Sequence, residues 1–289
     1  MNNLNEYKVW TALITPMNND TSVDYPSLEK LLKKQEHAGN GITLLGSTGE
    51  ALNLEVSERK NIVNFVTRLD LDVPIMVGCG GAVLSEQLDW IGYLNSKKIN
   101  AILLATPYYS KPGDIGQYEW FNSLFNASNF PVCLYNVPGR AAAPLSKAAF
   151  KKLADHKNFW ALKEASGSVE EFISYRDAAP SCHMLSGDDP MFALFTREDA
   201  KGVVSVAGNV WPEAVQKIAQ QFANSDFSNE ELFTEASKSL FSASNPIPAK
   251  AIMNDKKLIS SPELLLPLHK DDMRELDKVR QFDKELSNL

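Results

Sequence analysis

The sequence reads NFWALKEASG from Asn158 to Gly167. Four consecutive apolar residues, Phe159 to Leu162, predict a strand that is buried on both faces, as a parallel sheet requires. Lys163 follows them directly. Because an ammonium group is costly to remove from water, a lysine at the mouth of a buried strand either reaches solvent or is held there for chemistry.

The composition is that of an ordinary globular protein with a sizeable core. The chain has 289 residues, of which 44% are apolar and 22% are charged. A net charge of −7 and a pI of about 5.2 argue against a nucleic-acid or anionic-membrane partner. The start, MNNLNE, lacks the basic and apolar regions of a signal peptide, and no apolar run is long enough to span a bilayer.

The cysteines also indicate a compartment. Cys79, Cys133 and Cys182 are an odd number and lie far apart in the chain. They fit a reducing cytoplasm, where each is expected to be a small buried side chain. We therefore predict a cytoplasmic protein.

Strand-like segments recur along the chain, and amphipathic helical segments separate them. The predicted strands are residues 9–14, 42–45, 74–78, 101–105, 131–135, 159–163, 184–189 and 202–206. Eight strand-then-helix units with short connections predict a (β/α)8 TIM barrel. No Gly-x-Gly-x-x-Gly follows the first strand, which argues against a dinucleotide-binding open sheet.

Local signals place the helix ends. Asp24 and Gly39 are predicted to start and stop the first helix, and Ser168 with Glu171 has the spacing of a capping box. From about Ser228 the strand pattern stops and amphipathic helical segments follow. We predict a catalytic barrel over residues 1–227 and a helical extension over residues 228–289 that packs on it.

In a (β/α)8 barrel the active site lies at the carboxyl ends of the strands. These ends supply Thr15, the turn 46–50, Gly78, Tyr108, Tyr109, Tyr135, Lys163, Gly187, Asp188 and Ser205. None of the four histidines ends a strand, and no His-x-His or His-Glu-x-x-His spacing occurs. Neither a metal ion bound by histidines nor a nucleophile paired with histidine is therefore expected.

The remaining candidate nucleophile is the Lys163 amine. A neutral amine attacks a carbonyl to form a carbinolamine and then a Schiff base, whose iminium acts as an electron sink. Hydroxyl groups of Tyr135, Tyr109 and Ser47 at strand ends could relay the protons. The alternative is that Lys163 caps the barrel with its ammonium in solvent, and position alone leaves both readings open.

Other residues on this rim have two interpretations as well. The turn Gly46–Glu50 offers backbone N–H groups and two hydroxyls to a carboxylate, or is a tight turn before a helix. Arg140 is a carboxylate fork or a surface residue. For at least one of Asp188 and Asp189 we favour a helix cap before Pro190.

Taken together, these residues resemble the dihydrodipicolinate synthase family within the pyruvate-dependent N-acetylneuraminate lyase superfamily. The resemblance runs from about Trp10 to Met253. It rests on the motifs GSTGE (46–50), TPYY (106–109), YNVPGR (135–140), LKEASG (162–167), SGDD (186–189) and NPIP (245–248). Their order and spacing are specific to the superfamily.

The resemblance implies a role for each site residue. Lys163 would form the Schiff base with pyruvate, and Tyr135 would donate and accept protons through Ser47 and a neighbouring subunit's Tyr109. The implied substrate-binding residues are Thr48 for the pyruvate carboxylate, Val204 and Gly187 for the same pocket, and Arg140 for aspartate 4-semialdehyde. The family uses no metal or organic cofactor, serves lysine and diaminopimelate synthesis, and commonly forms homotetramers as dimers of dimers.

Three departures from the family pattern bear on specificity. Ser47 stands where the synthase usually has Thr, and Ala141 to Ala143 follow Arg140 where it usually has Thr-Gly. Ser, His and Asn of lysine-inhibited members correspond to Ala51, Val56 and Ala82 here, while Glu86 and Tyr108 remain. Without these polar partners we predict insensitivity to lysine. The alternatives are another pyruvate lyase, such as N-acetylneuraminate lyase, and a catalytically silent barrel that binds keto acids.

Overall fold

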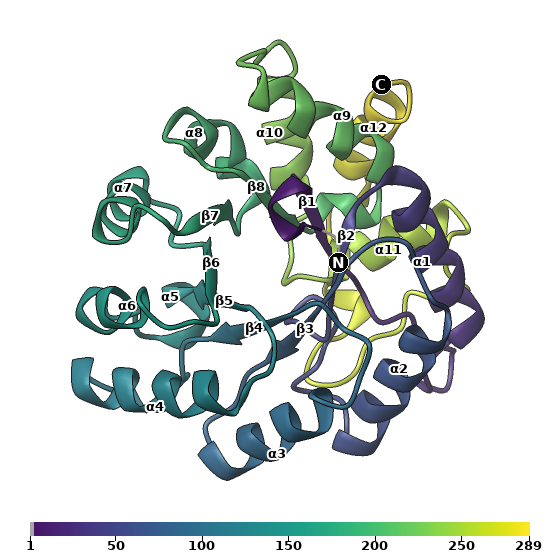
Figure 1. The fold of residues 1–289 in the computed structure, drawn as a ribbon. Helices are drawn as coiled ribbons and strands as arrows, with labels where there is room; N and C mark the ends of the chain where they lie inside the picture. Colours follow the sequence, from purple (N-terminus) through teal and green to yellow (C-terminus); the bar gives the residue numbers. More distant parts are fainter. Residues whose placement is uncertain (1–2) are drawn as a thin grey trace.

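A computed structural model describes residues 3–289 as a closed barrel of eight parallel strands in the order β1 to β8 (Figure 1). The strands are β1 Val9–Ala12, β2 Gly41–Leu44, β3 Ile75–Cys79, β4 Ala101–Ala105, β5 Val132–Asn136, β6 Phe159–Glu164, β7 His183–Ser186 and β8 Gly202–Ser205. The predicted fold class is therefore confirmed. The predicted seventh strand was too long at its end, because the backbone turns into a short 3-10 helix, η2 (Asp189–Met191).

Helices form the outer ring of the barrel, as Figure 1 shows. Those that follow the strands are α1 Tyr25–Ala38, α2 Val56–Arg68, α3 Leu84–Leu94, α4 Asp114–Ala127, α5 Pro138–Ala141, α6 Lys147–Leu153, α7 Val169–Ala178, α8 Phe192–Arg197 and α9 Pro212–Ala223. The remaining short 3-10 helices are η1 Leu4–Glu6, η3 Ala207–Asn209 and η4 Lys270–Asp272. The extension contributes α10 Glu230–Ser239, α11 Ile247–Asp255 and α12 Leu276–Leu286.

The predicted helix signals are found with one difference. Asp24 accepts a hydrogen bond from the Ser27 N–H, and Gly39 ends α1 with a φ of 73°. Ser168 caps α7 by accepting from the Glu171 N–H, so half of the capping box forms. The other half does not, because the Glu171 carboxylate pairs with Lys147 at 3.0 Å instead.

Two apolar layers hold the barrel together. A large layer lies between the strands and the surrounding helices. A smaller layer fills the barrel interior and includes Trp10, Met76, Cys133, Leu185 and Val204. Alternate residues of each strand serve the two layers, which explains why the strands read as continuous apolar runs. All three cysteines are buried and unpaired, as predicted.

Aromatic rings close the amino-terminal end of the barrel. The Trp10 ring lies 5.5 Å from that of Trp160, which in turn stacks on His183 at 6.0 Å. The Trp160 indole N–H donates to the side chain of Asn5 in η1. Burial, together with the weaker effect of the Lys201 ammonium, lowers the pKa of His183 to about 4.

His183 should make the protein less stable in acid. The unfolded chain takes up the proton near pH 6.5, but the folded chain does so only near pH 4, so stability is lost as pH falls through this window. The contribution is at most about 3 kcal/mol. Denaturant unfolding of wild type and His183→Gln at about pH 7.5 and about pH 5 tests it: the variant should lose less stability between them. Equal losses would contradict the assignment.

The extension is anchored to the barrel under the turn 46–50. Lys250 on α11 forms an ion pair of 2.5 Å with Glu50, and both side chains are fully buried. The second Glu50 oxygen accepts from the Leu265 N–H at 2.7 Å, and Lys250 also donates to the Glu263 carbonyl. Lys250 and Leu265, from two separate parts of the extension, thus both bind the Glu50 carboxylate of the barrel. The predicted division between residues 227 and 228 stays a prediction.

Breaking this ion pair on one side should be costly. In Lys250→Met the Glu50 carboxylate stays buried without its cation, so we expect a loss of about 3–5 kcal/mol in unfolding free energy. The double variant Glu50→Gln/Lys250→Met removes both charges and should recover part of that loss. Lys238→Met, which breaks the exposed Lys238–Glu235 pair of 2.8 Å, serves as control and should change little. A small loss in Lys250→Met would refute the anchoring role.

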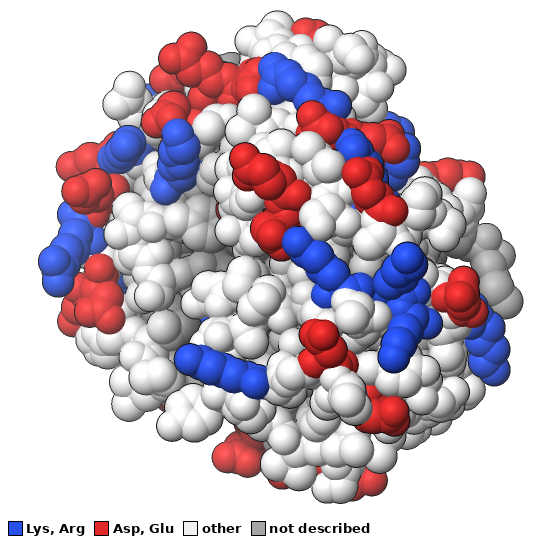
Figure 2. Space-filling model, turned by 90° about the vertical axis from the view of Figure 1, so that its left-hand side faces the viewer, with Lys and Arg blue, Asp and Glu red and all other residues white. Residues whose placement is uncertain are grey.

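On the face drawn in Figure 2, charged side chains of both signs lie around a broad uncharged area. No helix within residues 3–289 is both long and apolar enough to cross a membrane.

Candidate active site

The Lys163 amine lies beside the Tyr135 ring. β5 and β6 pair in parallel with Tyr135 opposite Lys163, so both side chains point into the barrel. The Lys163 Nζ atom is 4.1 Å from the centre of the Tyr135 ring. Lys163 is 6% exposed and Tyr135 is 9% exposed. The alternative of an ammonium that reaches solvent at the top of the barrel is therefore not what the structure shows.

A cavity of about 360 Å³ opens above this pair. Its lining includes five of the predicted site residues: Ser47, Thr48, Tyr135, Arg140 and Lys163. They come from the ends of β2, β5 and β6 and the loops that follow, so distant segments meet at one rim. The volume is at the low end of small-molecule pockets, which suits a few-carbon substrate.

The turn 46–50 is closed by its own backbone. The N–H groups of Gly49 and Glu50 donate to the carbonyls of Gly46 and Ser47, both at 3.1 Å. Thr48 is 3% exposed, and its hydroxyl oxygen accepts a hydrogen bond of 2.9 Å from the Asn245 side chain. The hydroxyl hydrogen of Thr48 therefore stays free to donate. The turn is both a tight turn and part of the cavity wall, so its two interpretations are compatible.

Three predicted residues lie outside the lining of the cavity. Tyr109 is 91% exposed, has a φ of 71°, and does not line the cavity of its own chain. Val204 is buried in the barrel interior on β8. Gly187 packs directly behind the nucleophile: a Cβ atom there would lie 2.8 Å from Lys163 Cγ. A larger residue at position 187 would displace the lysine.

The two aspartates after β7 do not cap η2 as we favoured. Asp188 makes no side-chain capping bond, and the shift of its pKa reflects its position: burial raises the pKa, and the nearby Lys163 ammonium opposes the rise. Asp189 accepts instead from the N–H groups of Val206 and Ala207 at 2.7 and 3.1 Å, across the barrel rim. Burial raises the Asp189 pKa to about 6. Tertiary contacts outcompeted the local cap.

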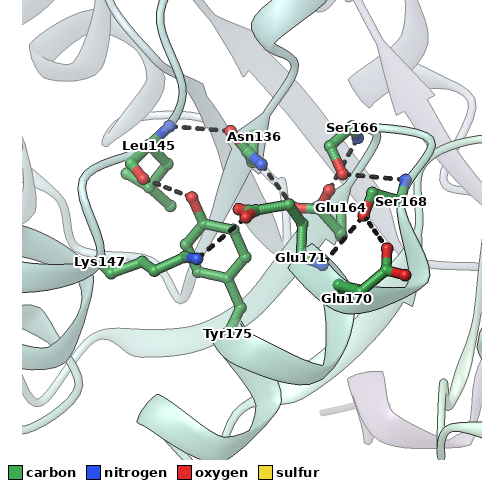
Figure 3. A network of polar contacts seen from close by, with 9 residues as sticks. All are labelled: Asn136, Leu145, Lys147, Glu164, Ser166, Ser168, Glu170, Glu171 and Tyr175. Atoms are coloured by element: carbon green, nitrogen blue, oxygen red, sulfur yellow. Dashed lines mark hydrogen bonds and ion pairs between the residues drawn. The ribbon is translucent and has the colours of Figure 1, made fainter.

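A polar cluster lies around Glu164 and Asn136 on the outer side of β5 and β6 (Figure 3). Glu164 is fully buried, and its two oxygens accept from the Asn136 side chain at 2.6 Å and the Ser166 N–H at 2.7 Å. Asn136 in turn accepts from the Leu145 N–H at 2.8 Å. In the sequence these residues stood out only as parts of motifs. The available signal was a glutamate that directly follows a buried strand.

Among residues 3–289 no group of three or more His, Cys, Asp or Glu side chains is arranged to hold a metal ion.

Known proteins resemble this chain over nearly its whole length. The model of the Dihydrodipicolinate synthetase family matches residues 5–286. The 4-hydroxy-tetrahydrodipicolinate synthase of Francisella tularensis subsp. novicida is 41% identical over 278 residues, 96% of this chain and 94% of its own. That of Wolbachia pipientis subsp. Culex pipiens is 39% identical over 277 residues, also 96% and 94%.

A solved structure has the same fold. The enzyme of Cyanidioschyzon merolae, crystallised with lysine bound, superposes with a TM-score of 0.90 at 29% identity and covers 98% of this chain and 99% of its own. Fold, rim residues and sequence similarity agree: the chain belongs to the dihydrodipicolinate synthetase family.

Proposed function

We propose that this protein is a 4-hydroxy-tetrahydrodipicolinate synthase, a lyase that works through a Schiff base. It would condense pyruvate with L-aspartate 4-semialdehyde in lysine and diaminopimelate biosynthesis. The family and the names of its relatives support this proposal. The single structural observation that carries it is the buried Lys163 amine, 4.1 Å from the Tyr135 ring at the base of a small cavity.

The proposed reaction begins at Lys163. Its neutral amine attacks the keto carbon of pyruvate, and loss of water from the carbinolamine leaves an iminium. Loss of a proton from the methyl carbon gives an enamine, which attacks the aldehyde of the second substrate. The amino group of that substrate then attacks the imine carbon and releases Lys163. Tyr135 handles the protons at the cavity base, with Ser47 as relay.

Carboxylates of the substrates have separate partners in this proposal. The Thr48 hydroxyl would donate to the pyruvate carboxylate, and the Val204 backbone and Gly187 would complete the same pocket. Arg140 is exposed at the cavity entrance, where its guanidinium can bind the carboxylate of the semialdehyde. No metal ion or organic cofactor takes part.

We also propose a cytoplasmic homotetramer built as a dimer of dimers. Tyr109 motivates this assembly, because its aromatic side chain is 91% exposed among the described residues 3–289. In a dimer it would reach the neighbouring site and complete the proton relay through Ser47.

Trapping the intermediate tests the proposed chemistry. Incubation with pyruvate and borohydride should add the mass of a reduced pyruvate imine to Lys163, located by peptide mass spectrometry. Lys163→Ala should give no adduct. Tyr135→Phe should lower kcat by about 10²–10⁴-fold, because it loses the proton donor. A wild-type protein without an adduct would refute both the synthase and the related lyases, and leave the keto-acid-binding barrel.

The second substrate needs its own assay. With an adduct formed, turnover of aspartate 4-semialdehyde in preference to N-acetylneuraminate supports the synthase, and the reverse supports a lyase. Two features of this chain make the comparison necessary: the serine at position 47 and the alanines 141–143 after Arg140.

Lysine should not inhibit the enzyme effectively. Ala51 lines the cavity with an apolar side chain, and Val56 is 48% exposed. Neither side chain can hydrogen-bond to an amino acid, so a bound lysine would lack the partners that Ser and His supply in lysine-inhibited members, although Glu86 and Tyr108 remain. Activity should persist at millimolar lysine, and the variant Ala51→Ser/Val56→His/Ala82→Asn should gain inhibition. Half-loss of wild-type activity at sub-millimolar lysine would contradict the prediction.

A further inference from the structure

We infer that Glu164 and Asn136 are positioning residues that couple the strand of the nucleophile to the loop that carries Arg140. Here we call their hydrogen-bonded pair the outer bridge. The inference rests on the roles proposed above for Lys163, Tyr135 and Arg140, and assigns the outer bridge a task in the same reaction.

The outer bridge lies directly behind the reacting side chains. Successive residues of a strand point to opposite faces, so Glu164 and Asn136 point outward where Lys163 and Tyr135 point inward. The strand register sets Asn136 opposite Glu164, one step beyond the Tyr135–Lys163 pair. Both outer side chains are fully buried, between the barrel and its helices. The outer bridge therefore lies where β5 ends and the loop that carries Arg140 begins.

The orientation of every group in the bridge is determined. The Leu145 N–H can only donate, so the side-chain oxygen Oδ1 of Asn136 faces it. The side-chain NH2 group of Asn136 therefore donates to Glu164. The other Glu164 oxygen accepts from the Ser166 N–H. Glu164 must therefore present two acceptors, which a carboxylate does and an amide does not. Burial raises the pKa of Glu164, and the hydrogen bonds from Ser166 and Asn136 oppose that rise.

The surrounding charges do not replace these bonds. Within residues 3–289 no lysine or arginine forms an ion pair with Glu164. The nearby Glu171 on α7 is paired with Lys147 on α6 at 3.0 Å, on the outer side of the cluster (Figure 3). Two neutral donors, the Asn136 amide and the Ser166 N–H, thus have to match the two oxygens of one carboxylate.

The outer bridge closes the base of one active-site loop. This loop comprises residues 137–144 and carries Arg140 on α5. Asn136 precedes it, and Leu145, which follows it, is held on both sides: its N–H donates to Asn136 and its carbonyl accepts from the Tyr175 hydroxyl. The Ala165 N–H also donates to the backbone carbonyl of Asn136 at 2.9 Å, which connects the base of the loop to the segment that follows β6. Arg140 is thereby placed relative to Lys163.

Exchanging the carboxylate and the amide of the outer bridge tests it, first one residue at a time. In Glu164→Gln the new amide faces either the Ser166 or the Asn136 donor, so the loop base loosens. We expect KM for aspartate 4-semialdehyde to rise about tenfold or more, while borohydride trapping of pyruvate on Lys163 proceeds as in wild type. Asn136→Asp places two buried carboxylates next to each other, so KM for aspartate 4-semialdehyde should rise further than in Glu164→Gln.

The double variant Glu164→Gln/Asn136→Asp should regain the hydrogen bonds of the outer bridge and a KM close to that of wild type. Its introduced aspartate accepts from the Leu145 N–H and from the amide of the introduced glutamine, whose oxygen accepts from the Ser166 N–H. All three hydrogen bonds return, so KM should fall to within about threefold of wild type. Glu171→Gln is the matched control: it neutralises a carboxylate of the same cluster, 38% exposed, and should leave KM unchanged.

Amide exchange gives a readout that does not depend on activity. The Leu145 and Ser166 N–H groups should exchange faster in Glu164→Gln and return to wild-type protection in the double variant. An unchanged KM in Glu164→Gln, or a double variant no better than either single one, would overturn the inference. If wild type does not turn over the semialdehyde, the proposed function falls, and the exchange data alone decide whether the bridge exists.

Discussion

The parallel pairing of β5 with β6 is the constraint on which the rest of this site depends. It sets Tyr135 opposite Lys163 on the inside and Asn136 opposite Glu164 on the outside. A slip of one residue would send the amine out of the barrel and the carboxylate into it. The closed barrel resists such a slip, because each strand has a neighbour on both sides and no free edge.

A second constraint acts on the opposite wall of the cavity. The turn 46–50 leaves β2 and is held from behind by the C-terminal extension, through Lys250 on Glu50 and Asn245 on Thr48. The extension therefore does more than cover apolar surface. It orients a hydroxyl at the cavity wall and neutralises a buried carboxylate that would otherwise be unpaired.

Some of this could be predicted from the residues alone. Apolar runs with turn residues at their ends were enough to predict the eight strands, and the rule that barrel chemistry sits at carboxyl strand ends placed Lys163 and Tyr135 among the candidates. Their expected roles came from the resemblance to a known family. Other parts could not be predicted from local pattern. Asp189 has the sequence context of a cap before Pro190, yet its carboxylate binds N–H groups of Val206 and Ala207, at the end of another strand.

By itself, the sequence determined the elements and the chemical groups they carry, because strand burial, helix caps and turns depend on neighbours a few residues away. Only the tertiary structure decided which of these groups meet. Glu164 and Asn136 are 28 residues apart, and Lys250 and Glu50 are 200 apart. Barrel closure and the packing of the extension bring each pair together. The match between donors and acceptors in a buried site is therefore a property of the fold, which no single segment contains.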